Sequence, residues 1–216
     1  MRKLPLLLAA ALATTLTACS RAPDTTASRP AAPPPAPAAP VNREARALLS
    51  DEKAVAGYAA YQKAMAPYAK EAMEIFASAY QKGGSDARKL EEAARADPRV
   101  VAYNQRNDEA LAKAGIHHSE VSTFASALTP YLTRVYLARD SVDAAAAAEK
   151  KKASGQPLGI GDEVALKMGA DATEKLKAAR EEFVAKYGAA ALEAVTRNEP
   201  ALLEAQDAMM KGALGK

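Results

Sequence analysis

The chain of 216 residues has one cysteine, two histidines, no tryptophan and only three phenylalanines. One cysteine cannot form an intrachain disulfide, and it excludes zinc and iron–sulfur sites built from several thiolates. The histidines, His117 and His118, are adjacent and too few for a histidine-rich metal centre. Aromatic residues make up 5% of the chain, which argues against a β-sandwich or a β-barrel. We therefore expect neither a metal nor a cofactor.

Alanine is what the chain has in excess. Its 55 alanines are about half of all its hydrophobic residues. Alanine is the best helix former and buries little apolar area, so helices with thin side chains between them are favoured. No segment alternates between polar and apolar residues as a half-buried strand would. Residues 42–216 are thus predicted to form one all-α bundle of five to seven helices, which is long enough to enclose a core.

The N-terminus has the layout of a secretory signal. Arg2 and Lys3 form a short positive region, and an apolar stretch of about ten residues follows over 4–13. That stretch is too short to cross a hydrocarbon core of ~30 Å as a helix. Small residues then lead to Leu16-Thr17-Ala18-Cys19. We predict that residues 1–18 are a cleaved signal peptide.

Leu16-Thr17-Ala18-Cys19 resembles the lipobox of bacterial lipoproteins. The resemblance implies that the Cys19 thiol carries a diacylglycerol and that the new amine is acylated, for example with palmitate. Ser20 follows in place of the Asp that marks inner-membrane retention in many Gram-negative bacteria, which implies the outer membrane, facing the periplasm. The alternative is an ordinary signal peptide that leaves Cys19 as a free thiol.

Proline is concentrated after the lipobox, since seven of the thirteen prolines lie between residues 20 and 41. Repeated proline removes amide donors and blocks helix formation. Residues 19–41 are therefore predicted to be a disordered linker, whose 22 residues after Cys19 reach roughly 70 Å if fully extended. We interpret it as a spacer between membrane and helical body. A proline-rich peptide ligand is the alternative, but no repeated P-x-x-P with flanking basic residues supports it.

Apolar residues at steps of three and four indicate the first helices. The first helix is predicted to start after Ser50, or slightly earlier, with residues 43–49 as a preceding turn. Pro67 should kink this helix, and the pair Gly83-Gly84 should end it. A short helix over 86–96 capped by Ser85, and another from Asp97-Pro98 to Gly115, are expected next. The stripe of this latter helix is Val100, Asn104, Asn107 and Leu111.

Three further helices are expected. Ser119 should cap the first of them, and Pro130 should bend it. After a loop over 155–161, Asp162 should cap a long helix that Gly188 breaks or weakens. Its predicted inner face is Ala165, Met168, Ala172, Leu176, Ala179, Phe183 and Tyr187. A helix over 189–197 is expected to restart at Asn198-Glu199-Pro200 and run through Met210.

Charge gives no sign of a nucleic-acid partner. Removing residues 1–18 leaves 27 basic and 26 acidic side chains, a net charge of +1. Binding to nucleic acid relies on an excess of positive charge, which is missing here. We expect membrane contact through the N-terminal lipid, and a protein of the cell envelope as partner.

Two groups of side chains are candidates for an interaction surface. Tyrosine is amphipathic and suits a partly wet interface, although filling a core poor in bulk is the simpler interpretation. The histidine pair lies in a predicted turn, where His117 and Glu120 could meet at a helix start. The candidate residues are Tyr58, Tyr61, Tyr68, Tyr131, Tyr136, His117 and His118.

The sequence thus favours a lipid-anchored helical protein that acts as an interaction or structural module rather than as an enzyme. Immunity proteins against periplasmic toxins and accessory factors of envelope machines would look alike. Two alternatives stay open. One is a hydrolase-like envelope enzyme in which His118, Glu120, Asn104 and Asn107 converge. The other is a carrier of a small ligand in a cavity lined by Tyr and Met.

Overall fold

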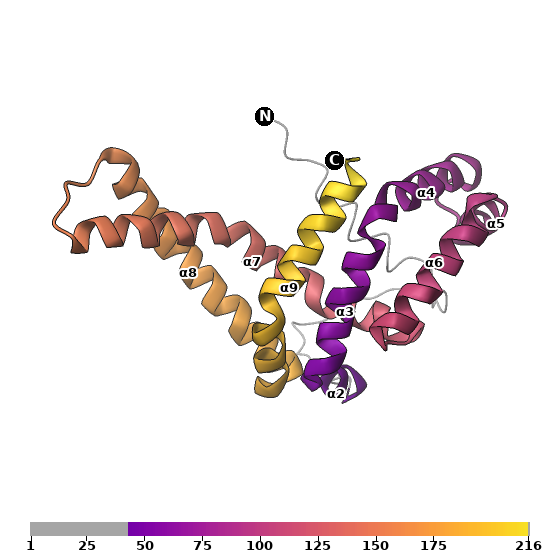
Figure 1. The fold of residues 1–216 in the computed structure, drawn as a ribbon, viewed down its shortest axis with the longest axis horizontal. Helices are drawn as coiled ribbons and strands as arrows, with labels where there is room; N and C mark the ends of the chain where they lie inside the picture. Colours follow the sequence, from indigo (N-terminus) through magenta and orange to yellow (C-terminus); the bar gives the residue numbers. More distant parts are fainter. Residues whose placement is uncertain (1–42, 216) are drawn as a thin grey trace, which may run out of the picture.

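The protein is described here from a computed structural model, which places residues 43–215. This part of the chain is all-α, as predicted, and contains no strand (Figure 1). The predicted signal peptide, Cys19, Ser20 and the predicted linker lie outside the described residues. The elements, in chain order, are α2 Arg43–Ser50, α3 Glu52–Met65, the 3-10 turn η1 Ala66–Tyr68, α4 Ala69–Gly83, α5 Ala87–Arg95, α6 Arg99–Ala114, α7 His118–Ala153, α8 Ile160–Tyr187 and α9 Ala189–Ala213.

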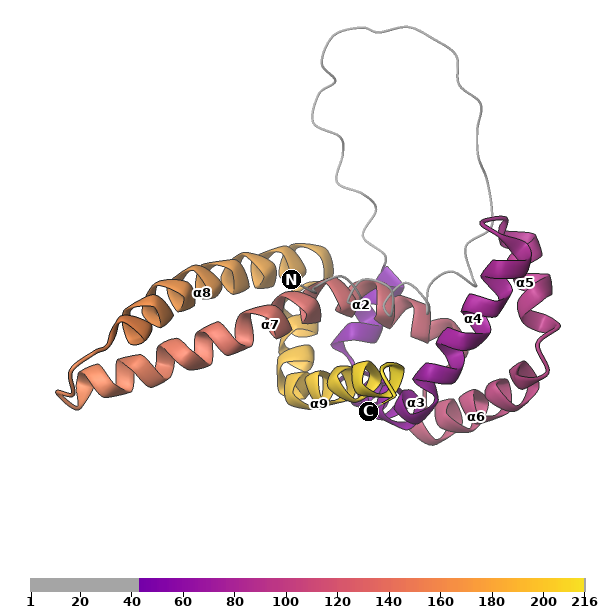
Figure 2. The same ribbon diagram turned by 90° about the horizontal axis from the view of Figure 1, so that it is seen from above.

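The helices divide into a packed body and a projecting hairpin. α7 and α8 run side by side along most of their length, and their connected ends extend well beyond the other helices (Figures 1 and 2). The hydrophobic core and the side chains packed against it include residues of α7 only up to Tyr136 and residues of α8 only from Leu176 onward. Residues 137–175 of this hairpin contribute nothing to that core, and we call them the arm.

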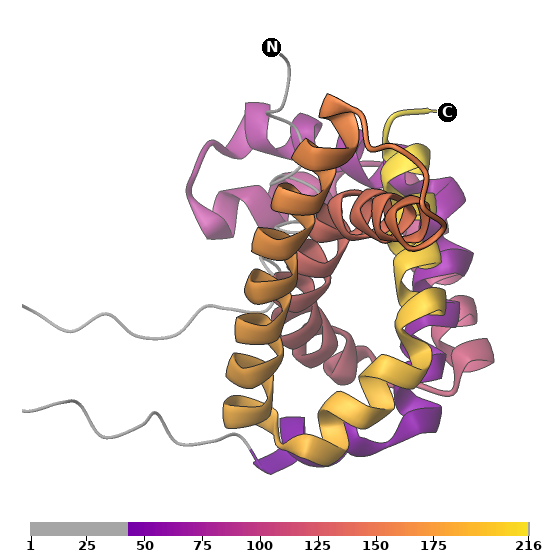
Figure 3. The same cartoon turned by 90° about the vertical axis from the view of Figure 1, so that its left-hand side faces the viewer.

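The core lies where α7 and the base of α8 meet α2, α3 and α9. Six large side chains are completely or almost completely buried there: Leu49, Val55, Phe124, Leu128, Val195 and Leu202. α8 and α9 meet at Gly188 and diverge from it, as the view along the arm shows (Figure 3). Burying about six such side chains stabilises the fold by roughly 1.5–3 kcal/mol each before the entropy of ordering the chain is deducted.

Glycines allow helices to cross closely at two places in the body. A Cβ atom added to Gly57 in α3 would lie 2.5 Å from the carbonyl oxygen of Ala114, at the end of α6. A Cβ added to Gly212 in α9 would lie 2.0 Å from the carbonyl oxygen of Ala66. Any side chain at these positions would push the helices apart, so the glycines are required by packing.

Several helix ends fall where the sequence predicted them. The helix that contains Pro67 is interrupted there by the 3-10 turn η1, because proline removes one amide donor and crowds the preceding turn. α4 ends at Gly83, followed by Gly84 with φ of 64°. α6 ends at Gly115 in the left-handed conformation, with φ of 67°. Gly188, with φ of 92°, interrupts the helix and separates α8 from α9.

Other helix ends were predicted wrongly. Residues 43–50 form a helix, α2, rather than a turn. The cap of α5 is Asp86, whose carboxylate accepts hydrogen bonds from the amides of Arg88 and Lys89, and not Ser85. α8 begins after Gly159, and Asp162 reaches back from inside the helix to the Gly159 amide. Both aspartates still satisfy amides that a helix start leaves free.

Pro200 does not start a new helix, because α9 continues through it from Ala189 to Ala213. The ring of Pro200 is exposed, so the carbonyl that loses its helical donor can bond to water instead. α7 likewise continues through the exposed Pro130, and the bend expected there stays a prediction.

The turn between α5 and α6 is held by the buried Asp97. Its carboxylate accepts from the Arg99 amide at 3.0 Å and from the Arg99 guanidinium at 3.0 and 2.8 Å. The same guanidinium reaches Glu74 on α4 at 3.1 Å. Hydrogen bonds from Arg99 lower the pKa of Asp97 to about 2 from an ordinary 3.8. Arg99 thus links the start of α6 to α4, and Asp97 holds its guanidinium in place.

This shifted pKa predicts how acid affects stability. A carboxyl whose pKa is lowered by folding stabilises the protein above pH 3.8 and loses that contribution as the pH falls towards 2. Asp97→Asn should therefore lower stability at neutral pH, and the difference from wild type should vanish over this window. Urea unfolding at a series of pH values measures it. Arg99→Gln should likewise reduce the change of unfolding free energy with pH over this range. If the unfolding free energy of Asp97→Asn falls with acid as steeply as that of wild type, Asp97 is not the group responsible.

Candidate interaction surfaces

Two of the candidate tyrosines belong to the core and not to a surface. Tyr58 and Tyr131 are each 3% exposed. The Tyr58 ring stacks on Phe124 with centroids 4.8 Å apart, and Tyr131 packs against Phe183 at 5.1 Å. The prediction that they lie on an interaction surface is therefore wrong. An alanine-rich bundle has few bulky side chains, so its tyrosines fill the interior.

The hydroxyl groups of these tyrosines have partners. Tyr131 donates to the Glu199 carboxylate on α9 at 3.0 Å, and the Tyr58 hydroxyl accepts from Gln62 at 3.0 Å. Burial, and then the neighbouring Tyr61, raise the pKa of Tyr58 well above its ordinary value. Both hydroxyls stay protonated at neutral pH and serve as neutral hydrogen-bonding groups. The bond of Tyr131 joins α7 to α9, whereas that of Tyr58 lies within α3.

Tyr61 and Asn107 form a second partly buried polar contact. The Tyr61 hydroxyl donates to the Asn107 side-chain oxygen at 2.7 Å, which ties α3 to α6. Burial raises the pKa of Tyr61 as well. Asn107 was predicted on the inner face of its helix and is buried there, whereas Asn104 is exposed, contrary to prediction.

The other two tyrosines are half-buried. Tyr68 lies under the guanidinium of Arg106, 4.6 Å from the ring centroid, and Arg106 also pairs with Glu71 at 2.5 Å. This is a cation–π contact between α6 and the η1–α4 segment. Tyr136 packs on the edge of the core. The five tyrosines therefore stabilise separate helix contacts, and they do not make one common surface.

The histidines lie at the start of α7, where both are exposed. The His117 amide donates to the Glu120 carboxylate at 2.7 Å, and the Glu120 amide donates to the His117 carbonyl at 3.0 Å. His117 and Glu120 do meet at a helix start, as predicted, but the Glu120 carboxylate receives a backbone amide. The N-cap of α7 is His117, so the prediction of Ser119 was wrong.

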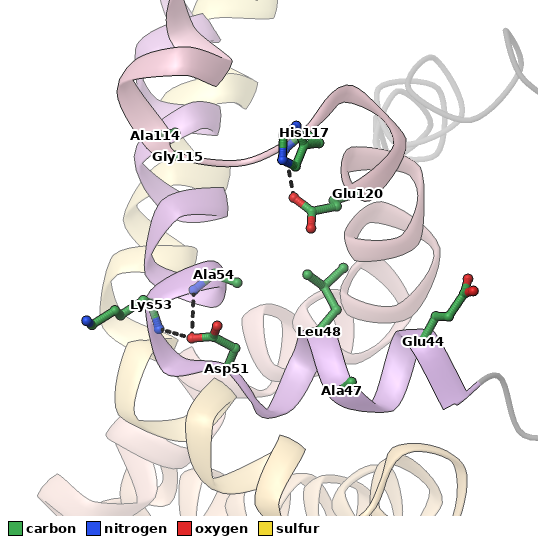
Figure 4. A pocket seen from close by; sticks show the side chains of 10 residues that line it. All are labelled: Glu44, Ala47, Leu48, Asp51, Lys53, Ala54, Ala114, Gly115, His117 and Glu120. Carbon is green, nitrogen blue, oxygen red and sulfur yellow. Dashed lines mark hydrogen bonds between the residues drawn. The ribbon is translucent and has the colours of Figure 1, made fainter.

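An open hollow of about 640 Å³ lies beside His117 (Figure 4). Its lining comes from α2, the start of α3 and the link between α6 and α7: Glu44, Ala47, Leu48, Asp51, Lys53, Ala54, Ala114, Gly115, His117 and Glu120. Two of its carboxylates cap helices, since Asp51 accepts from the amides of Lys53 and Ala54 and Glu120 accepts from His117. Some of their lone pairs already accept these backbone hydrogen bonds, so fewer of them are available to bind a ligand.

The residues suggested for an enzyme do not join in one hydrogen-bonded group within the described part of the chain. Asn107 bonds to Tyr61, Glu120 bonds to His117, and Asn104 is exposed. Residues 43–215 contain no cluster of three or more histidine, cysteine, aspartate or glutamate side chains able to hold a metal ion. None of the helices described for these residues is long and apolar enough to cross a membrane.

The arm carries an exposed apolar surface that the sequence reasoning missed. Its four large exposed hydrophobic residues are Leu137 at 65%, Ile160 at 83%, Val164 at 51% and Met168 at 55% exposure. Met168 was predicted to face inward, which is wrong. Ile160, Val164 and Met168 follow one another at steps of four and so line one side of α8. That spacing was visible in the sequence, but the inner stripe of α8 shares the same period.

Close packing defines the register of the two arm helices. A Cβ atom added to Gly169 in α8 would lie 2.1 Å from the Cβ of Ala145 in α7. Near the tip, Lys151 pairs with Asp162 at 2.8 Å, and this hydrogen bond is the main cause of the lowered pKa of Asp162. Small side chains at the interface and an ion pair at the tip hold α7 and α8 together outside the main core.

Comparison of the chain with family models, with curated proteins and with solved structures gave no match.

Proposed function

We propose that this chain is a lipid-anchored protein of the bacterial cell envelope that works as a helical interaction or structural module. The observation that carries the proposal is the sequence Leu16-Thr17-Ala18-Cys19, which places the single cysteine where a lipobox requires it. An ordinary signal peptide has no need of a cysteine at that position. Ser20 favours the outer membrane, with the helical body in the periplasm.

Lipid attachment at Cys19 accounts for membrane binding without a spanning helix. Each buried methylene contributes ~0.8 kcal/mol, and one acyl chain alone binds only marginally. The diacylglycerol and the amide-linked chain together supply three acyl chains, enough for lasting attachment. A linker of roughly 70 Å between Cys19 and α2 would let the body reach partners away from the bilayer.

The interaction part of the proposal is supported by the arm. Surface apolar residues are normal when scattered, but a group of them on a projecting element is typical of a contact site. Leu137, Ile160, Val164 and Met168 are four of the large exposed hydrophobic residues of residues 43–215, and all lie on the arm. We propose that this surface binds a protein of the cell envelope, either a second copy of this chain or a different protein.

Replacing Cys19 tests the anchor. Cells that express Cys19→Ala and are fed radioactive palmitate should show no label in this protein, and the chain should leave the membrane fraction. Ser20→Ala is the matched control, since it keeps the lipobox and should be labelled as wild type is. Equal labelling of wild type and Cys19→Ala would overturn the proposal.

A further inference from the structure

We propose that residues 84–96, which we call the strap, open as a unit and uncover the side of α4 formed by Phe76, Ala79 and Gly83. The strap consists of α5 and the turn residues on either side of it. It lies beside α4 at the end of the body opposite the arm (Figures 1 and 2). Beyond the proposed function, the strap controls access to an apolar surface that the closed fold covers.

Few side chains attach the strap to the rest of the fold. α5 is the helix within residues 43–215 that has no buried residue, and it adds nothing to the hydrophobic core. Its one large apolar side chain, Leu90, is only half-buried. α4 is the helix on which α5 packs. Because detaching α5 exposes little apolar area of its own, burial favours the closed state only weakly.

The charged side chains of α5 pair within the helix. Arg95 donates to Glu91 at 2.5 Å, and Arg88 lies 3.8 Å from Glu92. Asp86 caps the same helix. Within the described part of the chain, no hydrogen bond or ion pair joins α5 to another helix. None of these polar contacts therefore has to break for the strap to leave α4.

The two ends of the strap are fixed, and they limit where it opens. Gly84 follows α4 directly and has φ of 64°, a conformation that other residues rarely adopt. At the other end, Asp97 binds Arg99, whose guanidinium also reaches Glu74 on α4. The opening is thus confined to the residues between Gly83 and Asp97.

Small and aromatic residues of α4 lie under the strap. A Cβ atom added to Gly83 would lie 2.6 Å from the amide nitrogen of Leu90, so this glycine lies directly against α5. Ala79 and Phe76 precede Gly83 by four and seven residues, which places them on the same side of α4. Ala79 is only 1% exposed. Opening the strap therefore exposes apolar residues that are hidden from water in the closed fold.

Native-state hydrogen exchange of the full-length protein tests the opening. A detached helix of nine residues is too short to stay formed, so its amides exchange whenever the strap opens. The amides of residues 90–95 should exchange at least about 100-fold faster than those in the buried parts of α3 and α7, while α4 stays protected. Protection of α5 equal to that of α3 and α7 would overturn the proposal. Exchange of α4 and α5 at one common rate would do so too, because the strap would then not move by itself.

Gly83→Ala perturbs the closed state alone. Its Cβ would overlap the backbone of Leu90, so exchange of the α5 amides should become about ten-fold faster, with no change in α3 or α7. Gln81→Ala, at an exposed position on the last turn of α4, is the matched control and should exchange as wild type does. If Gly83→Ala exchanges as wild type does, α5 is not seated on Gly83 as proposed.

Thiol labelling shows whether the opening uncovers α4. Ala79→Cys should react with an excess of N-ethylmaleimide at least about 100-fold faster than Ala205→Cys, a completely buried position on α9 that only larger unfolding exposes. Peptide mass spectrometry separates both sites from Cys19. If Ala79→Cys reacts no faster than Ala205→Cys, the strap does not uncover this side of α4. Neither readout depends on whether Cys19 carries lipid, so the strap and the anchor are tested separately.

Discussion

Replacing Phe124 by alanine is expected to lower the free energy of unfolding by about 3–5 kcal/mol, the range found for large aromatic truncations in a packed core. Phe124 is completely buried, and its ring stacks on Tyr58 at 4.8 Å. It joins α7 to α3 at the centre of the hydrophobic cluster. The packed side chains around the ring relax only partly into the space it leaves, so the cost of a cavity adds to the loss of burial.

Urea unfolding followed by far-UV circular dichroism measures this loss. Phe76→Ala is the matched control, since Phe76 is a half-buried ring on α4 that stacks on the exposed Tyr80. We expect the control to lose less than half as much. Equal losses for the two variants would mean that α7 is not held to the body through Phe124.

Gly169→Ala is expected to destabilise the arm although alanine is the better helix former. Inside a helix, alanine gains about 1 kcal/mol over glycine. At Gly169 the added Cβ would lie 2.1 Å from the Cβ of Ala145 and 3.0 Å from the carbonyl oxygen of Ser141. Separating α7 from α8 to relieve this overlap costs about 1–3 kcal/mol, so the packing term should outweigh the gain in propensity.

Gly161→Ala is the control on the same helix, because a Cβ at Gly161 meets no atom within 4 Å. It should raise stability by a few tenths to about 1 kcal/mol. Hydrogen exchange of the arm amides measures both variants. Adding Ala145→Gly to Gly169→Ala should recover most of the lost protection, since it removes the atom that the new Cβ meets. Protection in Gly169→Ala equal to or above wild type would contradict the close packing.

Local chemistry explains which features of this fold were predictable. Pro67 interrupts a helix, Gly115 and Gly188 end helices, and Asp97 holds the start of α6. Each effect depends on a missing amide, a missing Cβ or a short carboxylate within a few residues. Apolar periodicity also indicated Leu111 and Phe183 as inward-facing residues of their helices, and both are buried.

The errors arise where two local signals compete or where a distant contact decides. Asp86 and Ser85 are both good N-cap residues, and moving the start of α5 by one residue changes which of them caps the helix. Met168 fits the period of the α8 inner face but lies at its margin, and the close approach of Gly169 to Ala145 turns it outward. Tyr58 could fill a core or line an interface, and the ring of Phe124 settles the question.

The sequence by itself determined that residues 43–215 are helical, that helices are interrupted or end at Pro67, Gly83, Gly115 and Gly188, and that Cys19 lies in a lipobox-like motif. Those properties depend on neighbouring residues, and the anchor that we propose at Cys19 would depend on a motif that is recognised before folding. Only the tertiary structure decided that α7 and α8 leave the body as an arm, and that Leu137, Ile160, Val164 and Met168 stay exposed on it. Exposure depends on which helices cover one another, and the period of a single helix does not specify its neighbour.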